Sequence, residues 1–159
     1  MSATKYPPMT HPRLQPLPLA ALVPPTPLFA IPPTTPIAEA LRLLVEQQRE
    51  AILVMDGRTV VGCFSEHAYA HSDLSATDPV SASLEFCPPA ADARQSVADC
   101  LERMDVEHWR HIPVQASGSI VALLSIEDLL RALIAHQQRI YREYQLDLRI
   151  LFLRGTYSC

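Results

Sequence analysis

The sequence predicts an α/β protein made of two copies of one unit, in which a short strand precedes a helix, a strand, a turn, a strand and a second helix. Residues 37–70, shifted by sixty positions, overlay residues 97–130 without a gap. In both copies, helical spacing alternates with short apolar runs that flank an Asp-Gly or Ser-Gly turn signal. Because a unit of about 60 residues buries little surface by itself, we expect the two units to pack through their sheets around one shared core.

Composition narrows the classes of protein that fit. The 159 residues are 48% apolar and carry a net charge of −4, so the chain can fold but lacks the basic field of a nucleic-acid-binding protein. The sequence has no run of about 18 apolar residues, so it predicts no membrane span. Its N-terminal apolar stretch is broken by prolines and is a poor signal peptide. None of the four cysteines, Cys63, Cys87, Cys100 and Cys159, lies in a Cys-x-x-Cys pair. We therefore expect a cytoplasmic protein with reduced thiols and no metal site.

The first 36 residues hold eleven of the fifteen prolines, which excludes a long helix or a central strand there. We expect residues 1–16 to form a flexible arm. Residues 17–23 are compatible with one short helical turn. Residues 28–31 predict a short strand that ends at two prolines.

The first unit, assigned to residues 17–74, continues with a helix that begins near Thr35. Thr35 is predicted to cap this helix, with Pro36 at its first position. One face is apolar at helical spacing. Strands are expected over 51–55 and 60–64, and Ser65 begins a helix that ends near residue 71.

The second unit, assigned to residues 75–135, repeats this order after a polar linker over 72–79. Two adjacent prolines make any strand over 84–91 short and irregular. A helix follows Ser96, strands are expected over 111–114 and 120–124, and Ser125 begins the last helical region. Residues 136–159 are assigned to a C-terminal helix and tail.

The expected C-terminal helix has an apolar face, which must pack against another surface. This face is formed by Ile140, Tyr141, Tyr144 and Leu148. It can pack on its own chain or against the same helix of a second copy in a homodimer. The sequence leaves both readings open.

The two copies differ at one informative position. Both keep a serine at the start of their last helix, Ser65 and Ser125, but Asp128 of the second copy corresponds to Ala68 of the first. Serine with an acid three residues later is a capping box, which needs no ligand. The same groups at a helix N-terminus can also hold a phosphorylated sugar, because free N–H groups attract phosphate and a carboxylate accepts from ribose hydroxyls.

Several segments together resemble a known family, the tandem CBS domains, also called the Bateman module, in the form of small bacterial stand-alone CBS pairs. The segments that carry the resemblance are Ala51–Gly57, Val60–Glu66, Arg110–Val114, Leu124–Leu129 and Leu153–Gly155. The resemblance implies two βαββα units related by pseudo-twofold symmetry, with a proline-rich N-terminal arm and a C-terminal helix added here. It also implies a homodimer and an adenine nucleotide (AMP foremost, with ADP, ATP and NAD as alternatives) bound between the sheets.

Site residues follow from the same resemblance. Ser125 and Asp128 match the motif that holds ribose and phosphate, His111, Ile112 and Pro113 match the strand along the base, and Ala91 lies where a pocket threonine is usual. In the first unit only Ser65 and His67 remain, so we expect a weak first site. Losing a hydrogen bond to a charged group costs about 1.5–3 kcal/mol.

Other candidates have simpler readings beside the functional ones. His67 and His71 have a spacing that can bind a metal, but no third ligand is near them in the sequence. Trp109 fits a core or interface position and, as the lesser alternative, a base-stacking one. No nucleophile, base and orienting group occur together, so we expect no catalysis by this chain alone. The family resemblance implies a regulatory protein that acts on an unidentified protein effector. The rival reading is a structural dimerisation module that has lost nucleotide binding.

Overall fold

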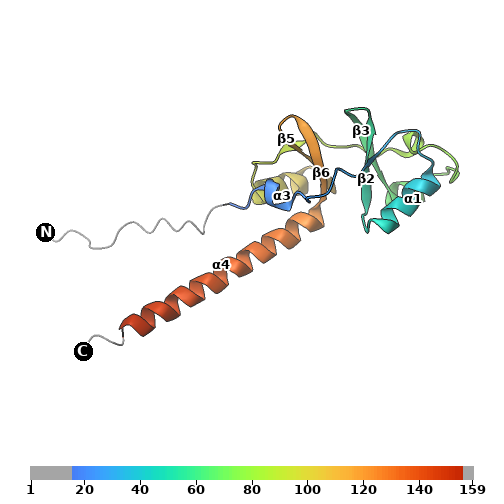
Figure 1. Ribbon diagram of the computed structural model, residues 1–159. Coiled ribbons are helices and arrows are strands. Elements are labelled where there is room, and N and C mark those ends of the chain that lie inside the picture. Colours follow the sequence, from blue (N-terminus) through green and yellow to red (C-terminus); the bar gives the residue numbers. More distant parts are fainter. Residues whose placement is uncertain (1–15, 156–159) are drawn as a thin grey trace.

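The computed structural model describes residues 16–155, apart from the side chains at 148 and 151–155. The arm predicted over residues 1–16 therefore lies almost wholly outside the described residues, as do the last four residues of the tail. The predicted α/β fold class is confirmed: the chain forms two three-stranded sheets with helices, in two halves that lie next to each other (Figure 1).

The first half has the order strand, helix, strand, strand, helix. Its sheet has the order β1-β2-β3, in which β1 runs parallel to β2 and β2 runs antiparallel to β3. A 3-10 helix, η3 (Val80–Ser83), follows the last helix. The elements are β1 (Ala30–Ile31), α1 (Ile37–Glu46), β2 (Ala51–Asp56), β3 (Thr59–Ser65) and α2 (Glu66–Ala70).

The second half repeats this arrangement, and its sheet has the order β4-β5-β6 with the same parallel and antiparallel pairings. Of the range 84–91, where any strand was predicted to be short and irregular, only Ala91 belongs to β4, in keeping with the adjacent prolines. The elements are β4 (Ala91–Asp92), α3 (Val97–Val106), β5 (His111–Ala116), β6 (Ser119–Ser125) and α4 (Ile126–Gly155).

The two halves match in detail at an offset of sixty residues, as the sequence repeat predicts. A register shift lies between Val54 and Met55 in one sheet and between Val114 and Gln115 in the other. Gln48 and His108, also sixty residues apart, both have positive φ, 51° and 57°. Equivalent backbone irregularities in both copies identify them as pseudo-twofold-related βαββα units.

The predicted single shared core is wrong: each half has its own cluster of buried side chains. In the first half Ile37, Ile52 and Phe64 belong to one cluster, and in the second half Val97 and Leu124, with others, belong to another. Side chains alternate along a strand, so each sheet has one face on its own helices. Residues of the opposite faces, such as Leu53 and Cys63, are buried but belong to neither cluster, which places them toward the junction between halves.

The chain before β1 packs on the second half, whereas it was predicted to belong to the first. The 3-10 helix η2 (Leu19–Leu22) confirms the predicted short turn, but Leu19 is fully buried in the second cluster. Its N–H donates to the carbonyl of Gln95 at 2.9 Å, and the Leu17 carbonyl accepts from Val97, the first residue of α3, at 2.8 Å. The reason is long-range: Leu17, Leu22 and Val23 also pack against the second cluster.

The start of α1 also differs from prediction. Pro36 is the capping residue, Ile37 is the first helical residue, and the Thr35 side chain makes no cap bond. Instead the Ile37 N–H donates to the Asp78 carbonyl at 2.9 Å and the Ala38 N–H to the Ala76 carbonyl at 2.8 Å. The predicted linker therefore folds back and satisfies the helix start that a threonine side chain would otherwise cap.

The last helix is one continuous α4 of 30 residues, with no break at the predicted boundary between 135 and 136. Leu129 near its start is buried in the second cluster. Beyond its first turns α4 extends away from both sheets (Figure 1), and Ile134, Tyr141 and Tyr144 are more than half exposed. In the described part of the chain, no helix is both long and apolar enough to cross a membrane.

Candidate functional site

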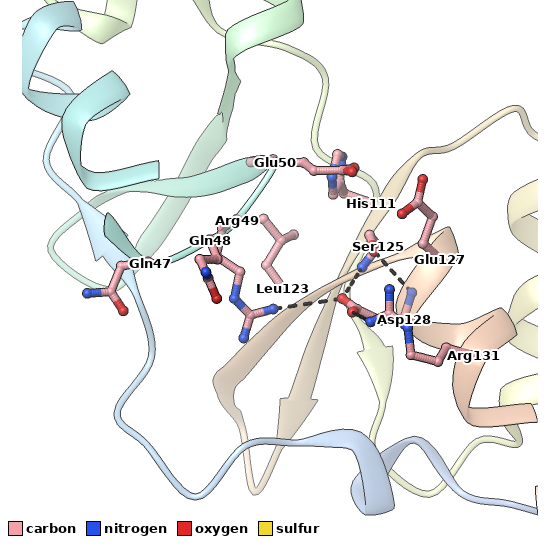
Figure 2. A pocket seen from close by; sticks show the side chains of 11 residues that line it. Gln47, Gln48, Arg49, Glu50, His111, Leu123, Ser125, Glu127, Asp128 and Arg131 are labelled. Carbon is pink, nitrogen blue, oxygen red and sulfur yellow. Dashed lines mark hydrogen bonds and ion pairs between the residues drawn. The ribbon is translucent and has the colours of Figure 1, made fainter. Parts of the chain in front are cut away.

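A cavity of about 400 Å³ lies at the junction of the two halves (Figure 2). One wall is the turn between α1 and β2 of the first half, and the other is the end of β6 with the first turn of α4. The lining residues are Gln47, Gln48, Arg49, Glu50, Ala51, His111, Leu123, Ser125, Glu127, Asp128 and Arg131. The cavity therefore combines groups from parts of the chain that are some eighty residues apart.

Ser125 and Asp128 form a reciprocal capping box at the start of α4. The Ser125 hydroxyl accepts from the Asp128 N–H at 3.1 Å, and the Asp128 Oδ2 accepts from the Ser125 N–H at 3.0 Å. The structural reading of this motif is thus correct, and it also fixes the carboxylate at the cavity wall. The capping bond uses one carboxylate oxygen, while Oδ1 has Arg131 at 3.8 Å, beyond hydrogen-bond distance. Oδ1 can therefore accept from a ligand hydroxyl.

Two arginines flank this carboxylate from opposite sides. Nη1 of Arg49, from the first half, lies 3.8 Å from Oδ2 of Asp128, and Nη1 of Arg131, one turn along α4, lies 3.8 Å from Oδ1. The Asp128 side chain is 29% exposed, and those of Arg49 and Arg131 are 39% and 76% exposed. At these distances the guanidinium groups balance the acid without direct hydrogen bonds to it, so their N–H groups can donate to an anionic ligand.

His111, the first residue of β5, lies between this cavity and a smaller one of about 200 Å³ on the other side. Its Nε2 is buried and has no hydrogen-bond partner among the described residues. Burial lowers the pKa of His111, while the negative charges of Glu50, Glu85 and Asp128 act in the opposite direction. The ring is therefore held mainly neutral, with one polar atom free at the junction between the cavities.

A second cavity of about 310 Å³ adjoins the first and shares Gln47, Arg49, Ala51 and Leu123 with it. Its other walls are mostly apolar: Pro24, Thr26, Pro27, Leu28, Phe29, Val121 and Ala122. The two cavities form one cleft, which we call the second cleft because Ser125 and Asp128 of the second half line it. It has a polar end at Asp128 and an apolar end at Phe29, and its size lies within the roughly 300–1,000 Å³ of small-molecule sites.

The predicted site residues divide into two groups. Ser125, Asp128 and His111 come together at the polar end of the second cleft. Ile112 and Ala91 are buried in the second cluster, and their side chains do not line it. Pro113 lines a separate cavity of about 420 Å³ beside the residues 86–90. Alternation along β5 explains the position of Ile112, because neighbouring side chains point to opposite faces of the sheet. Pro113 shares a face with His111 but lies two residues further along the strand.

The equivalent cleft of the first half, the first cleft, holds a smaller cavity of about 200 Å³ that is lined in part by Glu85, Phe86 and Pro88 of its own chain. Residues 84–90, which we call the strap, cross β3, and Cys63 and Glu85 exchange backbone hydrogen bonds of 3.2 and 2.8 Å. The Ser65 hydroxyl donates to Oε2 of Glu85 at 2.8 Å while accepting from the Ala68 N–H at 3.1 Å. Ser65 is 4% exposed, so both functions of its hydroxyl are already in use.

The first cleft also differs in the residues at its wall. Sixty positions after Arg49 stands Trp109, which lines the 200 Å³ cavity and packs against the second cluster. The Arg103 guanidinium lies over its ring, 4.9 Å from the centroid. Trp109 is therefore a packing residue here, in agreement with the simpler of the two readings. Ala68 supplies no acid.

His67, the other predicted residue of the first site, is exposed on α2. Its ring lies 4.5 Å from the ring of His71, and the His71 Nδ1 is 2.9 Å from the His67 carbonyl. Among the described residues, no group of three or more His, Cys, Asp or Glu side chains is placed to hold a metal ion.

Sequence reasoning missed the two arginines and Glu85. Arg131 carried a usable signal, because it lies one helical turn after Asp128 and therefore on the same face. Arg49 and Glu85 carried none, since each meets its partner only through the packing of distant segments. The strap itself was foreseen only as an irregular stretch around two prolines.

Comparisons with known proteins agree with this geometry. No curated protein sequence is similar enough to count as a match. A signal-transduction protein with CBS domains from Burkholderia ambifaria, described as putative, is 25% identical, with a TM-score of 0.65 over 73% of this chain and 93% of that one. A CBS domain protein from Pyrobaculum aerophilum in complex with AMP is 21% identical, with a TM-score of 0.62 over 70% and 89%.

A third similar structure, CBSX2 in complex with AMP, is 21% identical, with a TM-score of 0.62 over 76% of this chain and 98% of that one. The model of the CBS domain matches this sequence twice, over residues 22–70 and 72–135. These two matches cover most of the chain and coincide with the two βαββα halves, and the protein therefore belongs to the CBS-domain family, as a tandem CBS pair.

Proposed function

We propose that this CBS pair is a regulatory, ligand-sensing module that binds one adenine nucleotide, AMP foremost, in the second cleft. The observation that carries the proposal is the asymmetry between the clefts. The second has an open cavity, an acid at a helix start and two arginines. In the first cleft, the hydroxyl of Ser65 is already hydrogen-bonded to the carboxylate of Glu85. Two of the similar structures are AMP complexes, which supports the ligand class.

The two ends of the second cleft suit the two ends of a nucleotide. The apolar end at Leu28 and Phe29 suits a base, and Oδ1 of Asp128 suits a ribose hydroxyl. Arg49, Arg131 and the positive N-terminal end of α4 suit a phosphate. The polar lining also holds Glu50 and Glu127. Two arginines against three carboxylates favour a monophosphate over the more highly charged ADP and ATP.

In the proposed mechanism the nucleotide bridges the two halves. It would contact Arg49 on the first half and Asp128 with Arg131 on the second, so the bound state favours one arrangement of the halves. Because α4 begins at Ile126 and extends from the body, a shift at its first turn is carried along the helix. A protein effector would read the position of α4.

The test is a calorimetric titration of the full chain with AMP, comparing the wild type with Asp128→Ala. Loss of a hydrogen bond to a charged group, about 1.5–3 kcal/mol, predicts a Kd weaker by roughly tenfold to a hundredfold. Asp99→Ala is the matched control, because Ser96 and Asp99 repeat the same spacing at the start of α3 away from the cleft. Unchanged affinity in Asp128→Ala would show that this residue is only a cap.

A second candidate function, dimerisation, is favoured by the exposed apolar residues of α4. Leu130, Ile134, Tyr141 and Tyr144 are between 42% and 63% exposed, and their intervals of four, seven and three residues follow a heptad seam. A seam of this spacing complements a second copy of itself, so we propose that α4 pairs with α4 of another chain. Dimerisation and nucleotide sensing are compatible, since they use different surfaces.

Sedimentation of the full chain tests the dimer. The wild type is expected to be dimeric and the double variant Ile134→Arg, Tyr141→Arg monomeric, because two charges at the seam are buried without partners. Arg139→Ala, an exposed change on α4 outside the seam, serves as the control and stays dimeric. A monomeric wild type, or a dimeric double variant, would exclude this interface.

A further inference from the structure

Two cysteines are in contact where the strap crosses β3. Cys63 lies in β3, with 2% of its surface exposed, and Cys87 lies in the strap, half-buried. Each thiol lies within reach of a hydrogen bond from the other, and this proximity shifts the pKa of both. The strap pairs antiparallel with β3 at Cys63 and Glu85, which puts Cys87 one diagonal step from Cys63 on the same face.

Two further contacts fix this register. Ser65 and Glu85 are also diagonal neighbours, and their side chains are hydrogen-bonded at 2.8 Å. Between Cys63 and Val61 stands Gly62, and a Cβ built there would lie 3.0 Å from the Glu85 carbonyl oxygen and 3.1 Å from the Leu84 Cβ. The strap therefore lies directly on β3, so close that a side chain at position 62 would push it away by a few tenths of an ångström, and this closeness brings the sulfur atoms together.

The two thiols differ in chemistry as well as exposure. The hydrogen bond from Cys63 lowers the pKa of Cys87, and the same bond, with burial and the nearby charges, raises the pKa of Cys63. The thiolate is the form that reacts with oxidants. Cys87 also lines the 420 Å³ cavity at the strap. An oxidant that enters this cavity therefore meets the more reactive sulfur first and has the second sulfur beside it.

We propose that Cys63 and Cys87 are a redox modification site, in which a hydroperoxide such as hydrogen peroxide converts the two thiols into a disulfide that fixes the strap over the first cleft. The inference rests on the thiol contact and the pairing of the strap with β3. It does not depend on nucleotide binding at the second cleft, where Leu123 and Pro27 stand at the positions sixty residues from Cys63 and Cys87.

The chemistry takes two steps. The Cys87 thiolate attacks one peroxide oxygen, the O–O bond breaks, and the sulfenic acid forms while hydroxide leaves and takes up a proton as water. The Cys63 sulfur then attacks the Cys87 sulfur, an S–S bond forms, the S–O bond breaks, and a second water leaves with the Cys63 proton. Two thiols and one hydrogen peroxide give one disulfide and two waters. A dithiol reductant reverses the modification by exchange.

Both cysteines lie in one tryptic peptide, residues 59–94, because the sequence has no Lys or Arg between Arg58 and Arg94. After treatment of the folded full chain with hydrogen peroxide, this peptide is expected to be lighter by two hydrogen atoms and resistant to alkylation. Cleavage at Glu66 or Glu85 is then expected to leave the pieces linked. A dithiol restores the reduced mass. In the reduced chain Cys87 is alkylated on the order of tenfold or more faster than Cys63.

Variants assign the roles. Cys63→Ala is expected to accumulate sulfenic acid at Cys87, trapped by a dione reagent, and Cys87→Ala to leave Cys63 unmodified. Cys100→Ala, which removes a buried cysteine of α3, is the matched control and still forms the disulfide. A 59–94 peptide that stays reduced while peroxide oxidises other residues would overturn the proposal. So would a disulfide that links either cysteine to Cys100 or Cys159 in the folded chain.

Discussion

The hydroxyl of Ser65 donates a 2.8 Å hydrogen bond to the carboxylate of Glu85, twenty residues later in the chain. In the second half the equivalent hydroxyl, that of Ser125, accepts only the capping bond from Asp128 among the bonds described for it. The first half thus presents an anion of its own to the serine at the start of its last helix. This contact is one reason why two units with the same fold have different clefts, with a cavity of about 200 Å³ in the first and one of about 400 Å³ in the second.

Replacement of Glu85 tests how much the strap depends on this contact. Glu85→Ala removes a hydrogen bond to a charged group, so we expect the free energy of unfolding to fall by about 1–3 kcal/mol, measured by urea denaturation. Amide exchange over residues 84–90 is expected to speed up. Glu66→Ala, an exposed acid at the start of α2, should stay within about 0.5 kcal/mol of the wild type. Equal exchange rates for Glu85→Ala and the wild type would mean that other contacts hold the strap.

Gly62 tests the close approach of the strap to β3. The added Cβ of Gly62→Ala would lie 3.0 Å from a backbone oxygen, so the strap must shift, and such overpacking costs about 1–3 kcal/mol. We expect a lower melting temperature and a faster reaction of the Cys87 thiol with a disulfide reagent. Thr59→Ala, at the exposed start of the same strand, is the control. A melting temperature equal to that of the wild type would show that no close contact exists at Gly62.

His111 predicts how stability depends on pH. Its pKa is lowered in the folded chain, chiefly by burial, so the unfolded chain binds the proton more tightly and stability rises with pH in this window. The contribution is complete above the ordinary pKa of 6.5 and is lost as pH falls from there toward the lower folded value. We expect the free energy of unfolding to decrease as the pH falls below about 6.5.

The variant His111→Gln isolates this effect, because glutamine stays neutral over the whole range. Its stability is expected to fall less with acid than that of the wild type. The control is His108→Asn, which removes an exposed histidine with positive φ and replaces it with a residue that tolerates this backbone. If wild type and His111→Gln lose stability in parallel, another group governs the acid sensitivity.

The sequence predicted what depends on local spacing. The sixty-residue repeat, the strand and helix order, and the start of the last helix at Ser125 and Asp128 all depend on neighbours within a few positions, and the structure confirms them. The same holds for residues 84–91, where two adjacent prolines predicted that any strand would be short and irregular. Local patterns of this kind are the strongest information that a single sequence carries.

The features that the sequence did not predict are contacts between distant segments. Thr35 has the right residue type for a cap, but the carbonyls of Ala76 and Asp78 accept the hydrogen bonds from the first N–H groups of α1 instead. Leu19 belongs to the second half although it precedes the first. Arg49 reaches Asp128 only because two halves pack together. Periodicity and capping rules describe a single element, so they cannot identify which remote segment will cover it.

The asymmetry of the two clefts is tested most directly by the stoichiometry of AMP binding to the wild-type full chain, measured by isothermal titration calorimetry at a chain concentration well above Kd. We predict one nucleotide per chain, because the second cleft is open whereas in the first cleft Ser65 is already hydrogen-bonded to Glu85. Two equivalent nucleotides per chain would contradict it, because Glu85 would then have to leave Ser65 at no cost. No binding of AMP, ADP, ATP or NAD at all would contradict nucleotide sensing itself.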